Sequence, residues 1–234
     1  MNSLIKLELK KTNIRPYFWA VLAITLSMIG FLYTFSLIAY VGSDLDAAEF
    51  SSYYSIFALT SALNMAAYSI LAAVMFSRFL LKDYSDKNAL LLFSYPVDRK
   101  SILHAKTILV SVFCLFSMIA GTAVMYLIYG ITETIFPLVN DTFSLSLFLR
   151  FTVDTLLYAA TAIFIGMISL RIGFVKKSVQ TTIVTAVVIC CCMANIVAAT
   201  NYTNVFFILT FGVTTAVTIF AFNNLSKSIE RMEA

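Results

Sequence analysis

The sequence has little charge, few helix-breaking residues and a single histidine. Of 234 residues, 12% are charged, and there are only seven glycines and three prolines. By contrast, 61% are hydrophobic and the mean hydropathy is +0.92, well outside the range of soluble globular domains. The shortage of charge excludes a soluble domain and indicates an integral membrane protein.

The motifs that carry common enzyme chemistry are also missing from the sequence. It contains no GxSxG or HExxH motif and no paired carboxylates that could form an intramembrane hydrolase. It also lacks a GxxxxGK[ST] loop, whose glycines let backbone N–H groups surround a phosphate. We therefore expect no catalytic residue and no ATP site in this chain.

Residues that could bind a metal are few and scattered. His104 lies at the edge of an apolar run, where a lipid headgroup or backbone group is the expected hydrogen-bond partner. Cys114 and the run 190–192 fall within apolar segments, where thiols pack as small apolar side chains. Three consecutive thiols point around most of a helical turn and do not converge on one ion. No metal site or disulfide is expected.

Six apolar runs are long enough to cross a bilayer as helices. A helix rises about 1.5 Å per residue, so about 20 residues cross about 30 Å of hydrocarbon. The runs lack the alternation of a membrane barrel, so the expected fold is all-α, with the whole chain, 1–234, forming one transmembrane domain. Polar residues such as Thr132 and Glu133 indicate loops between runs. The predicted spans are residues 17–41, 55–81, 103–129, 147–170, 180–200 and 205–222.

Basic residues are segregated by this arrangement. Fifteen of the sixteen Lys and Arg residues fall at one end of the six spans, and only Arg150 falls at the other. Because cytoplasmic segments carry the excess of positive charge, this end and both termini are predicted to face the cytoplasm. The net charge of +4 is thus a topological signal, and membrane lipids rather than nucleic acids are the expected partners.

Polar residues inside the spans are candidates for a substrate pathway or gate. Arg150 and Asp154 are spaced i and i+4, so they form either a polar patch for a substrate or a mutually neutralising pair that anchors the helix at the interface. Asn64 and Asn195 are further candidates. Buried amides also serve as interhelical hydrogen-bond partners, and the sequence favours that structural role.

Small residues recur four apart, a spacing that lets helix backbones approach closely. These pairs fit either contacts within the chain or a seam between two copies. They are Ala62 and Ala66, Ser69 and Ala73, Ser117 and Gly121, and Ala162 and Gly166.

Two segments are suited to the cytoplasmic membrane face. Residues 1–16 mix leucines with lysines and are predicted to lie along the interface. Residues 78–106 hold six of the sixteen basic residues. Within them, 83–95 is predicted as a short helix that ends before Pro96. Its apolar ridge, 90–93, needs cover from the bilayer, from the spans or from a partner.

The order of these parts resembles the permease subunits of ABC-2 type transporters. The similarity is greatest to a short six-span branch linked to bacitracin and lantibiotic resistance and to export of amphipathic peptides such as phenol-soluble modulins. The residues that carry it are Leu7-Glu8-Leu9-Lys10-Lys11, Leu90-Leu91-Leu92-Phe93-Ser94-Tyr95-Pro96-Val97-Asp98-Arg99, Ile102 and Lys106.

The resemblance implies that helix 83–95 is a coupling helix docked on a separate cytoplasmic ABC ATPase, which binds ATP and Mg²⁺. Two permeases and two ATPases would form an exporter of a hydrophobic or amphipathic peptide in a bacterial plasma membrane, with a second copy or a related chain as the other permease. The alternative is a non-transporting sensor or assembly factor that recruits a cytoplasmic partner through the same segment. The implied coupling residues are Tyr84, Leu90, Leu91, Phe93, Pro96 and Arg99.

Overall fold

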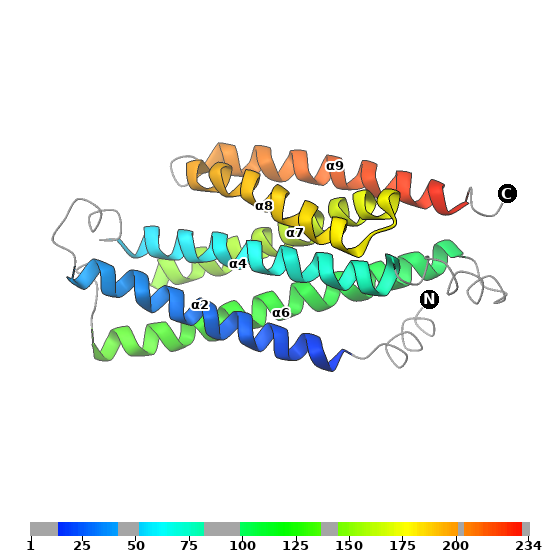
Figure 1. The fold of residues 1–234 in the computed structure, drawn as a ribbon. Helices are drawn as coiled ribbons and strands as arrows, with labels where there is room; N and C mark the ends of the chain where they lie inside the picture. The colour runs from blue at the N-terminus through cyan, green and yellow to red at the C-terminus, as the bar shows by residue number, and fades with distance from the viewer. Residues whose placement is uncertain (1–13, 42–51, 82–98, 137–144, 201–203, 231–234) are drawn as a thin grey trace.

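The computed structural model describes residues 14–41, 52–81, 99–136, 145–200 and 204–230 (Figure 1). This part of the chain is helical and contains no strand, which confirms the all-α class. The helices are α2 (Arg15–Val41), α4 (Tyr53–Phe76), which continues into the π-helical segment η1 (Ser77–Leu81), α6 (Arg99–Ile135), α7 (Leu145–Lys176), α8 (Val179–Thr200) and α9 (Asn204–Glu230).

Five of the six predicted spans each fall within one of these helices, and the span 55–81 falls within α4 and η1 together. Within the described residues, four helices are long and apolar enough to cross a membrane: Arg15–Tyr40, Tyr53–Leu81, Ile102–Ile135 and Arg150–Lys176. The chain is therefore a multi-pass membrane protein. The apolar part of α8 is shorter, Val179–Met193, so the full count of six spans stays a prediction.

The predicted start of the loop between the third and fourth spans is wrong. Thr132 and Glu133 were expected between two spans, but both belong to the last turns of α6. The carboxylate of Glu133 is buried, with 4% of the residue exposed. Helix α6 continues through these polar residues because they face other helices and find partners there.

Successive helices run in alternating directions (Figure 1). The start of α2, the end of η1, the start of α6 and the end of α9 therefore lie at one end of the bundle. Described basic residues such as Arg15, Arg78, Lys106, Lys176 and Lys177 belong to this end, and Arg150 belongs to the other. This agrees with the predicted segregation of charge, while the orientation in the membrane stays a prediction.

The centre of the bundle is formed by α4 and α7, which pack extensively on each other. In the apolar window of α4, 67% of residues are buried inside the protein, compared with 17% for α2. Helices α2 and α6 cover α4 on one side, and α8 and α9 pack on α7 on the other (Figure 1). Any movement of α4 must therefore be accommodated by most of the other helices.

Two glycines allow close contacts within the chain. A Cβ at Gly166 of α7 would lie 2.9 Å from Cβ of Ala72 in α4, and one at Gly121 of α6 would lie 2.8 Å from Oγ1 of Thr25 in α2. At Gly166 the added carbon would meet a Cβ that is fixed to the backbone of α4, so one helix would have to move. At Gly121 it would meet the hydroxyl end of the Thr25 side chain. Both small-residue positions therefore serve packing inside the chain, one of the two interpretations that the sequence left open.

We predict that Gly166→Ala destabilises the protein by about 1–3 kcal/mol, because the added methyl group pushes α7 away from α4. Thermal unfolding of the detergent-purified protein would measure this. Gly30→Ala is the matched control, since a Cβ at Gly30 meets nothing within 4 Å and alanine favours a helix by about 1 kcal/mol. Equal stability of the two variants would contradict the close packing.

Candidate functional site

The end of α4 changes its winding immediately before the predicted coupling segment. Residues Ser77–Leu81 form a π-helical turn, a geometry that is rare and often found at functional positions. Nζ of Lys106 on α6 donates a hydrogen bond of 3.2 Å to the carbonyl oxygen of Phe79. Only 3% of Lys106 is exposed. This buried charged hydrogen bond joins the two helices that flank residues 82–98.

The coupling residues themselves lie outside the described residues. This holds for the whole predicted helix 83–95 and for Pro96, and Arg99 is described only as the first residue of α6. The described helices on either side of this segment end at Leu81 and begin at Arg99. The structure leaves the roles of Tyr84, Leu90, Leu91 and Phe93 as predictions.

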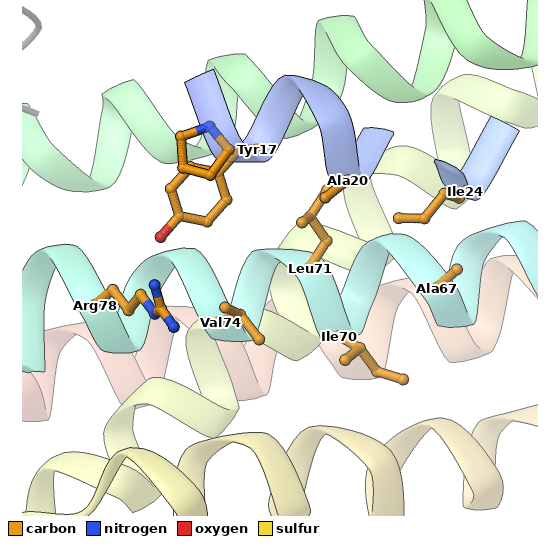
Figure 2. Close-up of a pocket in the computed structure, with 9 residues that line it drawn as sticks. Tyr17, Ala20, Ile24, Ala67, Ile70, Leu71, Val74 and Arg78 are labelled. Atoms are coloured by element: carbon orange, nitrogen blue, oxygen red, sulfur yellow. The ribbon is translucent and has the colours of Figure 1, made fainter. Parts of the chain in front are cut away.

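A groove lies between α2 and α4 at the same end of the bundle (Figure 2). Its volume is about 460 Å³, and its lining is almost entirely apolar. Arg78 and Tyr17 lie at one end of the groove, with the hydroxyl of Tyr17 pointing toward the guanidinium of Arg78 (Figure 2). The residues lining it are Pro16, Tyr17, Ala20, Ile24, Ala67, Ile70, Leu71, Val74 and Arg78.

A row of hydrogen bonds joins α4 to α6 along their length, and we call it the α4–α6 seam. The hydroxyl of Tyr53 donates to Oε1 of Glu133 at 2.6 Å, Oγ of Ser61 and the hydroxyl of Tyr126 are 2.8 Å apart, and the hydroxyl of Tyr68 donates to the carbonyl oxygen of Ser117 at 3.1 Å. The residue numbers of the partners on α6 decrease as those on α4 increase, as expected for antiparallel helices.

Asn64, predicted as a candidate for the pathway, is part of the α4–α6 seam. Its Nδ2 donates to Oγ1 of Thr122 at 3.0 Å, and 4% of the residue is exposed. The Thr122 hydroxyl in turn donates to the carbonyl oxygen of Met118. This arrangement matches the interhelical role that the sequence favoured for Asn64. Asn195 lies in α8, but its side chain is outside the described part.

A cluster of hydroxyl groups continues the seam toward α2. The hydroxyl of Tyr129 lies 2.8 Å from Oγ of Ser36, and that of Tyr33 lies 2.6 Å from Oγ1 of Thr132. Together with Glu133, these side chains fasten α2, α4 and α6 at the end opposite the groove. Nothing in the sequence beyond the polar residues themselves indicated this cluster, because its members come from distant segments.

Arg150 and Asp154 keep their i, i+4 spacing near the start of α7. The guanidinium carbon of Arg150 lies 5.4 Å from the centroid of the Tyr54 ring, within range of a cation–π interaction. That ring also contacts Phe151. Tyr54 and Asn64 are ten residues apart on α4, about 15 Å. Arg150 and Asn64 therefore lie at different levels of the bundle.

The described residues contain no group of three or more His, Cys, Asp or Glu side chains that could hold a metal ion. His104 packs edge-on against the ring of Phe222 at 5.1 Å, which connects α6 to α9. Cys114 is buried and its Sγ lies 3.9 Å from Sδ of Met75. Many of the described polar groups thus bond either between helices, as in the α4–α6 seam, or to the carbonyl oxygen one turn earlier in their own helix, as Thr60 does to Ile56.

Comparison with known proteins adds to this picture. Residues 4–193 match the sequence profile of a family described as ABC-2 family transporter protein. A curated relative, the uncharacterized protein YcbO of Bacillus subtilis (strain 168), is 28% identical over 104 residues, which cover 44% of this chain and 44% of the relative. The aligned part thus spans less than half of that protein, and no solved structure matches.

The family match extends from the segment before α2 into α8 and includes both helices that flank residues 82–98. It also agrees with the apolar helical bundle, which has several helices long enough to cross a membrane. On this evidence, the chain belongs to the ABC-2 family of transporter proteins.

Proposed function

We propose that this chain is the transmembrane permease subunit of an ATP-driven exporter that moves a hydrophobic or amphipathic peptide out of the cell or membrane. The observation that carries the proposal is the junction at residues 77–106. The predicted docking segment leaves α4 through the π turn η1 and returns into α6, and Lys106 bonds the two flanking helices together. A force applied to this segment therefore acts on both helices.

The energy source in this proposal is a separate cytoplasmic ATPase that binds ATP and Mg²⁺. Closure of the ATPase subunits would displace helix 83–95 and, with it, η1 and the start of α6. Because α4 packs on α7, α8 and α2 as well as on α6, its displacement would change the arrangement of the whole bundle. A second copy or a related permease would complete the transport cavity.

The substrate class is proposed from the chemistry of the bundle. Its described interior is joined along the α4–α6 seam mostly by hydroxyl and amide groups, with the carboxylate of Glu133 at one end, and its surface is apolar. Such a protein offers few groups to replace the hydration shell of a bulky polar solute. A substrate that partitions into the bilayer avoids this cost, with Arg150 and Asp154 as candidate polar contacts at the end opposite the groove.

The docking role predicts that replacing Leu91 and Phe93 together with Asp abolishes co-purification of the ATPase and stimulation of its activity. Two buried charges in an apolar contact cost several kcal/mol, while membrane insertion should be unchanged. The measurement is a pull-down of the tagged protein in detergent, identification of the captured proteins and an ATPase assay.

The matched control for this docking test is Ser85→Asp combined with Asn88→Asp, which adds the same charge at polar positions of the same segment. We expect the control to retain the ATPase. Survival of the complex in the Leu91 and Phe93 variant would show that the docking assignment is wrong. Capture of a cytoplasmic protein without ATPase activity would contradict the exporter and favour a sensor or assembly factor.

The transmission role predicts a different result for Lys106→Met. Loss of a hydrogen bond from a buried charged group weakens the η1–α6 junction by about 1.5–3 kcal/mol. The ATPase should still co-purify, but its stimulation should fall several-fold. Lys176→Met, at an exposed position on the same end of the bundle, is the control and should leave stimulation intact. Loss of co-purification in Lys106→Met alone would argue against a role in transmission.

A further inference from the structure

The groove between α2 and α4 has apolar walls and a positively charged side chain at one end. Its walls are formed by Ile24 on α2 and by Ile70, Leu71 and Val74 on α4, and alanines on both helices leave room between them (Figure 2). Helix α2 is the least buried of the apolar helices, so the groove lies at the periphery of the bundle. Such a groove on a membrane protein is accessible to lipid chains.

Arg78 places a positive charge at one end of the groove. It is exposed, lies at the groove end near the start of α2, and extends from the π turn. The neighbouring Tyr17 is buried, its hydroxyl points toward the guanidinium (Figure 2), and its ring packs edge-on against Phe79 at 5.3 Å. A guanidinium and a phenol that converge in this way provide several donors for phosphate oxygens.

The dimensions of the groove match one leaflet of a bilayer. The lining residues extend from Ala67 on α4 to Arg78 in η1, a distance of about 16 Å along the helix axis. Half of the hydrocarbon thickness is about 15 Å. With the basic end of the bundle at the cytoplasmic surface, Arg78 lies at headgroup level and Ala67 lies near the bilayer midplane.

We propose that this groove binds an anionic phospholipid of the cytoplasmic leaflet, with its phosphate on Arg78 and Tyr17 and one acyl chain along the apolar walls. The proposal rests on the predicted orientation in the membrane and is independent of the transported substrate. The positive charge of Arg78 selects an anionic headgroup, and the apolar channel selects a lipid over a soluble phosphate.

Native mass spectrometry of the full-length protein would test this site, with phosphatidylglycerol, phosphatidylcholine and glycerol 3-phosphate as probes. We expect retained phosphatidylglycerol and little glycerol 3-phosphate. Arg78→Gln should lower the preference for phosphatidylglycerol over phosphatidylcholine about fivefold, as expected for the loss of one basic residue near an anionic headgroup. Lys176→Gln, which removes an exposed charge at the same end of the bundle, should preserve it.

A second variant tests the apolar part of the groove. Ala67→Phe fills part of the groove without changing the charge of the protein, and it should reduce retention of both phospholipids. Monodisperse elution and an unchanged helical circular dichroism spectrum would show that both variants are folded. Wild-type lipid retention in Ala67→Phe, unchanged preference in Arg78→Gln, or equal binding of glycerol 3-phosphate would each overturn the proposal.

Cross-linking identifies what occupies the groove in the membrane. A benzophenone amino acid in place of Ile70, which lines the groove, should cross-link to lipid in vesicles that contain phosphatidylglycerol. A cross-link to a second copy of the chain, to residues 1–13 or to an amphipathic peptide would instead assign the groove to that occupant and overturn the proposal.

Discussion

The hydrogen bonds of the α4–α6 seam are the interaction on which the rest of the bundle depends. In hydrocarbon, water is absent and each polar side chain needs a partner within the protein. Ser61, Asn64 and Tyr68 meet this need with groups on α6. Each of these groups on α4 meets its partner on α6 at only one position along the helix axis. The pairs therefore fix the register of the two helices. Apolar packing alone would leave that register poorly determined.

The contact between α4 and α7 is held in a different way. It combines a close approach of Ala72 to Gly166 with aromatic contacts such as that of Tyr54 with Phe151. Dispersion forces between closely packed side chains contribute more here than in the α4–α6 seam. The seam therefore specifies position along the helix axis, and the close approach at Gly166 limits the distance between the axes of α4 and α7. Together they account for the high burial of α4 in the described bundle.

Prediction from sequence succeeded where it depended on long apolar runs. The helical class and the positions of the described apolar helices follow from composition, because about 20 consecutive apolar residues have few other stable arrangements in a bilayer. It failed at Glu133, where a charged residue near the end of a run was interpreted as a loop. Its partner Tyr53 lies 80 residues away, so nothing local indicates that the carboxylate is buried.

The site was harder to predict than the fold for the same reason. Asn64 was identified as polar and buried, but its partner Thr122 depends on helix register, which no local pattern encodes. The π turn at η1 and the bond from Lys106 to Phe79 also arise from tertiary packing. The residues that the family resemblance singled out for docking, such as Leu91, fall outside the described part, so the structure tests their surroundings only.

Helix α6 is 37 residues long, about 55 Å, and it is fastened to α4 near both ends, by Lys106 at one and by Glu133 at the other. A rod fixed at two distant points can neither slide nor rotate independently of its neighbour. The α4–α6 pair is therefore a stiff lever almost twice as long as the hydrocarbon layer is thick. A small change of tilt at its basic end becomes a proportionally larger lateral displacement at the far surface of the membrane.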